Sequence, residues 1–143
     1  MTEQVAGDTL ANAMGTTVTV GRVVSLSPKE VWRFLVTRDG AEALLGDGAV
    51  LGDKGDSWRA ANGTYGVVRS YHPLEQIRFS WHAADDTPKT LVDVHLIPED
   101  GGTRIEIRHE QIPHYFDVVA ITKRWEAALA KVDDASALAG ATN

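Results

Sequence analysis

Apolar and polar residues alternate over much of the chain, which is the pattern of β-strands that bury one face. Residues 76–82 show it most clearly, because Ile77, Phe79 and Trp81 share one face while polar side chains occupy the other. Other stretches alternate in the same way or are rich in β-branched residues. The predicted strands are 16–26, 57–61, 65–71, 76–82, 90–97 and 103–109.

Short turn-forming segments separate several of these strands. Asn62-Gly63 is a typical two-residue hairpin turn, and residues 98–102 (PEDGG) are turn-forming as well. Strands at such short spacing pair with their neighbours in the antiparallel sense. The pattern therefore predicts one antiparallel sheet of about six to seven strands.

The residues after the first strand predict the start of a helix. Ser27 is suited to the N-cap, Pro28 to the first helical position, and Glu30 completes a capping box three residues after the cap. Apolar residues then recur at helical spacing from Val31 to Leu35. A second short helix is predicted at 39–45.

A long helix is predicted at 113–132, where no proline or glycine follows Pro113. Its apolar residues recur at the spacing of one helix face, while charged residues lie off that face. The apolar stripe consists of Val118, Ile121, Trp125, Ala128, Leu129 and Val132.

These elements predict an α+β fold in which a curved antiparallel sheet wraps around the long C-terminal helix, with two short helices after the first strand. Residues 16–133 form the predicted domain. Residues 1–15 and 134–143 show weak periodicity or small polar side chains, so we predict flexible tails there.

Composition narrows the function classes. The chain of 143 residues has a net charge of −6 and no basic cluster, which argues against nucleic-acid binding. It contains no cysteine, so disulfides and thiolate chemistry are excluded. No apolar run approaches the length of a membrane span, and no signal peptide is visible. We therefore expect a cytoplasmic protein.

Four stretches resemble the START-like (SRPBCC) superfamily, and its branch named after the activator of the heat-shock protein 90 ATPase is the most similar. They are LSPKEVWRFLVT (26–37), GVVRSYHPLEQIRFSWH (66–82), VDVHLIPEDGGTRIEIRHE (92–110) and RWEAALAKV (124–132). The resemblance implies the helix-grip fold. Because the superfamily includes lipid binders, cyclases, hydroxylase subunits and co-chaperone domains, it implies several possible functions.

Aromatic residues are the first candidates for a ligand site. Trp58, Phe79, Trp81 and Phe116 could line a cavity between sheet and helix, or they could simply fill the core. The resemblance to a ligand-binding superfamily favours a cavity as much as a filled core.

Three polar or aromatic residues extend this candidate set. Tyr65 and Arg69 share a strand face by alternation. If that face points inward, Arg69 could bind a ligand carboxylate. If the face points outward, Arg69 is a solvated charge. His109 follows Ile105 and Ile107 in alternation, so it should point inward as a ligand-binding or hydrogen-bonded structural residue.

No metal or cofactor is expected. Asp93 and His95 lie two residues apart on one strand, as metal ligands can. However, they alternate with apolar residues, so we predict that both lie on the solvated face. We also find no catalytic motif.

The leading hypothesis is non-enzymatic binding of a hydrophobic small molecule or lipid, in a cavity between the sheet and the C-terminal helix. A cavity of roughly 300–1,000 Å³ would support it, and a filled interior would contradict it. The alternatives are a chaperone-interaction module with an exposed apolar patch on the sheet, and a cyclase- or hydrolase-like enzyme using the same cavity. Monomer and homodimer both remain open.

Overall fold

The computed structural model describes residues 15–141 and shows a six-stranded antiparallel sheet with three helices. The strand order across the sheet is β1-β6-β5-β4-β3-β2. This confirms the predicted α+β helix-grip fold. The elements are β1 (Thr16–Val24), α2 (Pro28–Leu35), α3 (Arg38–Leu45), β2 (Ser57–Arg59), β3 (Tyr65–His72), β4 (Gln76–Trp81), β5 (Thr90–Glu99), β6 (Gly102–Ile112) and α4 (Val118–Ala141).

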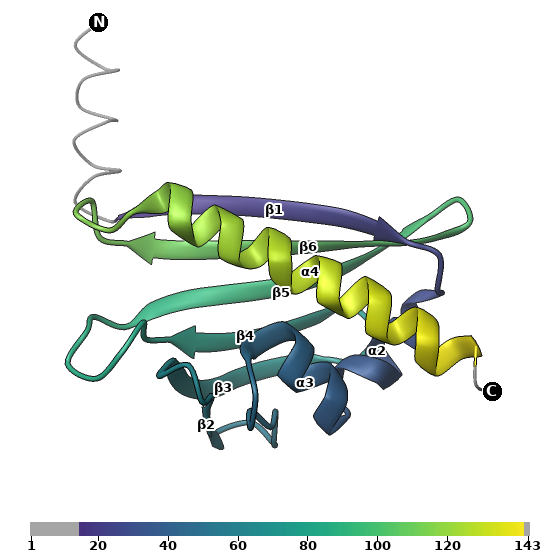
Figure 1. Cartoon of the computed structure of the whole chain (residues 1–143), viewed down its shortest axis with the longest axis horizontal. Coiled ribbons are helices and arrows are strands. Elements are labelled where there is room, and N and C mark those ends of the chain that lie inside the picture. The colour runs from purple at the N-terminus through teal and green to yellow at the C-terminus, as the bar shows by residue number, and fades with distance from the viewer. Residues whose placement is uncertain (1–14, 142–143) are drawn as a thin grey trace, which may run out of the picture.

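All three helices cover the same face of the sheet. Helix α4 crosses the strands obliquely, and α2 and α3 lie beside it (Figure 1). Among residues 15–141, no helix combines the length and the hydropathy that a membrane-spanning helix requires.

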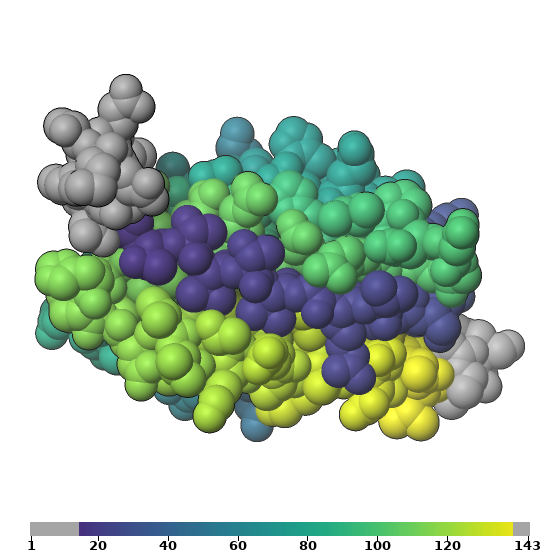
Figure 2. Space-filling model, turned by 90° about the horizontal axis from the view of Figure 1, so that it is seen from above, coloured from purple at the N-terminus to yellow at the C-terminus, as the bar shows by residue number. Residues whose placement is uncertain are grey.

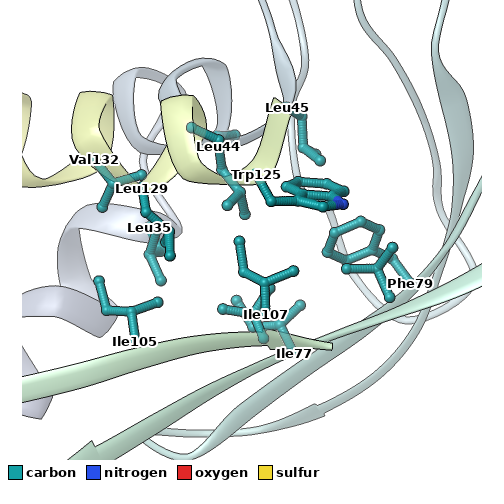
Figure 3. Packing of buried hydrophobic residues seen from close by; sticks show 14 of the residues in the cluster. Leu35, Leu44, Leu45, Ile77, Phe79, Ile105, Ile107, Trp125, Leu129 and Val132 are labelled. Atoms are coloured by element: carbon teal, nitrogen blue, oxygen red, sulfur yellow. The ribbon is translucent and has the colours of Figure 1, made fainter. Parts of the chain in front are cut away.

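The space directly between α4 and the sheet is filled by side chains. Trp125 and Leu129 of α4 point toward strand residues that include Phe79 and Ile107, and α2 and α3 add leucines from the side (Figure 3). These residues are almost completely buried. The expected cavity is therefore not located beneath the middle of α4.

Helix α2 begins as the sequence predicts. The Ser27 hydroxyl accepts a hydrogen bond from the Glu30 amide at 3.2 Å, and the Glu30 carboxylate accepts from the Ser27 amide, which completes the capping box. These interactions hold the pKa of Glu30 below its ordinary value.

The turn between α2 and α3 is very tight. The Thr37 hydroxyl accepts a hydrogen bond from the Gly40 amide and so caps α3. A Cβ atom at Gly40 would lie only 1.9 Å from the carbonyl oxygen of Phe34. Glycine at this position therefore allows α3 to begin directly against the end of α2.

Strand β1 forms one edge of the sheet. Figure 2 shows it as a purple band between the rest of the sheet and α4. The Arg22 guanidinium donates to the Asp133 carboxylate at 2.9 Å, which joins this edge strand to the helix.

The predicted boundaries of the last helix were wrong at both ends. Helix α4 starts at Val118 because the Asp117 carboxylate caps it, accepting from the Ala120 amide at 3.1 Å. It continues to Ala141, well beyond the predicted end at Val132. Ser136 is buried on this extension, so tertiary contacts support it. Of the predicted tails, residues 1–14 and 142–143 lie outside the described residues.

The prediction that Asp93 lies on the solvated face was also wrong. Asp93 does point away from the helices, but only 4% of it is exposed. The Arg78 guanidinium lies 3.4 Å from its carboxylate, and the Gln76 amide donates to it at 2.8 Å. Long neighbouring side chains can cover a short one on a sheet surface, which alternation alone cannot indicate.

Candidate functional site

A groove of about 500 Å³ lies between α3 and the first half of α4. The sheet contributes to it only at the end of β4, through Trp81, and the turn before α4 contributes Phe116. Most of its lining is apolar. The lining residues are Glu42, Ala43, Leu44, Leu45, Gly46, Asn62, Trp81, Ala83, Phe116, Asp117, Ala120, Ile121, Arg124, Ala127, Ala128 and Lys131.

Trp81 connects the groove to the interior of the protein. It is 97% buried, and its ring lies 4.9 Å from the His109 ring in an edge-to-face arrangement. The Arg124 guanidinium lies over the same indole, 5.5 Å from the ring centroid. Trp81 is therefore held between a buried histidine and a charged residue of the groove.

A chain of hydrogen bonds fixes His109 behind Trp81. The Trp125 indole donates to His109 Nδ1 at 3.0 Å, so this nitrogen is the acceptor. The other ring nitrogen, Nε2, lies 2.7 Å from the Thr90 hydroxyl, and that hydroxyl donates to the Trp81 carbonyl oxygen. Since the hydroxyl proton is already used, Nε2 must carry the imidazole proton and donate to Thr90.

This environment keeps His109 neutral. Burial, and secondarily the positive charge of Arg124, lower its pKa to about 4. Both ring nitrogens have partners, and the ring is completely buried. His109 is thus a hydrogen-bonded structural residue in this structure, and it does not line the groove.

Of the seven residues predicted to bind a ligand, the structure brings Trp81 and Phe116 together in the groove. His109 lies behind them. Trp58 and Phe79 pack edge-to-face in the core at 5.8 Å, and the Trp58 indole donates to the Ser80 carbonyl oxygen.

Tyr65 and Arg69 lie elsewhere. Tyr65 stacks on His82 at 4.4 Å and lines a separate hollow beside β2. Arg69 is exposed, on the face of β3 opposite to the buried Val68. Arg69 is therefore a solvated charge and does not bind a ligand carboxylate in the interior. The register of β3 against β4 shifts between Val68 and Ser70, and beyond this bulge Tyr71 packs against the core.

Sequence reasoning missed the α3 and α4 residues that form the walls. Leu45 and Ala128 look like ordinary core residues, and Ala120, Ala127 and Arg124 lie off the apolar stripe of α4. Only the spacing between the two helices makes them neighbours of one hollow. No periodic signal in the sequence encodes that spacing.

Metal ligands do not cluster in the described part of the chain. Among residues 15–141, no group of three or more His, Asp or Glu side chains could hold a metal ion. Asp93, one of the two residues considered as metal ligands, forms an ion pair with Arg78 and accepts a hydrogen bond from Gln76.

Solved structures with the same fold share little sequence with this chain. The Aha1 dimer from Colwellia psychrerythraea has a TM-score of 0.70 at 19% identity, covering 85% of this chain and 96% of its own. Protein CV1439 from Chromobacterium violaceum has a TM-score of 0.68 at 23% identity, covering 84% and 96%.

A third similar structure is DynU16, a protein of the dynemicin biosynthetic locus. Its TM-score is 0.71 at 17% identity, over 84% of this chain, which spans less than half (46%) of DynU16. At these identities the similarity establishes the fold. No curated protein matches the sequence.

Most of the domain matches the sequence model of one protein family. The model of the family "Activator of Hsp90 ATPase homolog 1-like protein" matches residues 25–136. This range runs from the entry of α2 to the last buried turn of α4 and includes every residue that lines the groove. The chain therefore belongs to the Activator of Hsp90 ATPase homolog 1-like family, a branch of the START-like superfamily.

Proposed function

We propose that the protein binds a small hydrophobic molecule in the groove between α3 and α4. The observation that supports this proposal is the groove itself: its volume of about 500 Å³ suits a small molecule, and its lining is mostly apolar. The proposed position differs from that expected from the sequence, since the space beneath α4 is filled.

Trp81 and Phe116 are the proposed aromatic contacts. Phe116 is half-buried and packs against the core, and Trp81 is fixed from behind by His109 and Trp125. Because these rings are held by packing before a ligand arrives, little conformational entropy is lost on binding.

The alternative of a chaperone-interaction module receives less support from the surface. That hypothesis expects an apolar patch on the sheet, whereas the outer face of the described strands carries ion pairs. Its exposed apolar residues include Val23 and Ile97, and both are register partners of Arg104. An isolated pair of this kind is ordinary on a protein surface.

The enzyme alternative also lacks a converging site. It requires His109, Arg69 or a tyrosine to meet in the cavity, but His109 is enclosed and Arg69 is on the exposed side of the β3 bulge. We therefore propose binding without catalysis. We also propose that the protein is cytoplasmic, and that it functions as a monomer or a homodimer.

The proposal can be tested with the neutral fluorescent probe N-phenyl-1-naphthylamine. We expect saturable binding of one probe per chain. Ala127 lines the groove and is exposed, so Ala127→Trp should fill the groove without disturbing the core, and should weaken binding about tenfold or more.

The matched control is Ala137→Trp, an exposed position on the same helix outside the groove, which should leave probe binding unchanged. Equal binding by both variants, or no saturable binding at all, would contradict the proposal. In a separate experiment, native mass spectrometry of freshly purified protein would detect a small molecule that co-purifies with the chain.

A further inference from the structure

Four charged residues line the groove, and its two carboxylates already have partners. Glu42 accepts a hydrogen bond from the Gly48 amide at 2.7 Å and lies 3.9 Å from the Arg38 guanidinium. Asp117 caps α4 at the positive end of the helix dipole. Neither carboxylate is left to repel an anionic ligand at full strength.

The two cations of the groove are in a different situation. Arg124 and Lys131 take part in none of the ion pairs found among residues 15–141. They lie seven residues apart, two turns along the same face of α4, and both line the groove. A ligand in the groove therefore meets two unpaired positive charges.

Arg124 is the better placed of the two. Its guanidinium carbon lies 5.5 Å from the ring centroid of Trp81, the residue through which the sheet contributes to the groove. A guanidinium carries five N–H donors in one plane, and two of them match the two oxygens of a carboxylate. Lys131 lies about 10 Å further along the helix axis.

We propose that the groove selects small molecules that join an apolar or aromatic body to a carboxylate, and that Arg124 binds the carboxylate. This inference rests on the proposed binding function and adds the chemical class of the ligand. The body of the ligand contacts Trp81 and the alanines of α4, while the carboxylate pairs with the guanidinium that lies over the indole.

The test compares 2-naphthoate with its neutral analogue 2-naphthamide by isothermal titration calorimetry. We expect the wild-type protein to bind the carboxylate more tightly, by about three- to tenfold, as befits a half-exposed charge-assisted contact. Arg124→Gln should remove this preference. The quantity compared is the ratio of the two affinities, because Arg124 lines the groove and its substitution alters the site for both ligands. Arg124→Lys should retain part of the preference, since lysine keeps the positive charge but lacks the planar pair of N–H donors.

The matched control is Lys123→Gln, which removes an exposed charge on the same helix but does not line the groove. This variant should keep the wild-type preference. If the wild type binds both ligands equally, or Lys123→Gln and Arg124→Gln have the same effect, the inference is wrong while the binding function stands. If neither ligand binds, and N-phenyl-1-naphthylamine does not bind either, the proposed function fails as well.

Discussion

The indole of Trp125 donates a hydrogen bond to Nδ1 of His109 at 3.0 Å, and this contact joins α4 to β6 in the centre of the core. Because Nδ1 is the acceptor, the imidazole must carry its proton on Nε2, where Thr90 receives it. Every polar atom of this cluster is satisfied. The helix and the sheet are thus connected by a directional contact as well as by apolar packing.

Acid should destabilise the protein through His109. The folded protein keeps this residue neutral, with a pKa of about 4, whereas the unfolded chain takes up a proton near pH 6.5. The unfolded state therefore binds more protons between these values, so the free energy of unfolding falls as pH is lowered through this window. We expect a loss of about 2 kcal/mol between pH 7.5 and 5.

Urea denaturation at several pH values would measure this effect. His109→Gln should be less stable at pH 7.5 but should lose most of the decrease between pH 7.5 and 5. An equally steep decrease in the variant would show that other groups are responsible.

Trp125→Phe should reduce stability by more than the loss of apolar area alone. The substitution leaves Nδ1 of His109 buried without a donor, and an unsatisfied buried acceptor costs about 1–3 kcal/mol. Thermal or urea unfolding would measure the difference. Trp32→Phe is the matched control: Trp32 is half-buried and contacts Tyr71 edge-on, a contact that phenylalanine can keep. Equal losses in the two variants would contradict the importance of the hydrogen bond.

Gly40→Ala should destabilise the α2–α3 turn and, with it, one wall of the groove. The added methyl group would meet the Phe34 carbonyl oxygen, a backbone atom that cannot move aside without shifting a helix. We expect a loss of about 1–3 kcal/mol in unfolding free energy and weaker probe binding. Arg38→Ala, at an exposed position two residues earlier, should change stability by less than about 0.5 kcal/mol.

The ion pair between Arg78 and Asp93 should contribute more than a fully exposed pair. Asp93 is nearly buried, whereas Arg59 and Asp85 form a pair in which both side chains are mostly exposed. In double-mutant cycles with alanine, we expect a coupling energy of about 1 kcal/mol for Arg78–Asp93 and near zero for Arg59–Asp85. The opposite ranking would mean that burial of Asp93 does not strengthen the pair.

Local sequence patterns were sufficient to predict the helices and strands and most of their buried faces. The capping box at Ser27, the alternation through Ile77 and Phe79, and the helical stripe around Trp125 are all local periodic signals, and each was confirmed. These signals arise from the geometry of one helix or strand at a time, so they can be recognised without knowing any partner.

Features that depend on two or more elements could be recognised only in the folded protein. The bulge at Arg69 follows from the pairing of β3 with β4, and the burial of Asp93 follows from side chains on a neighbouring strand. The partners of His109 come from α4 and β5. The groove likewise exists because α3, held by the turn at Gly40, lies at a particular distance from α4. Such distances result from packing between segments far apart in the chain, and local periodicity carries no information about them.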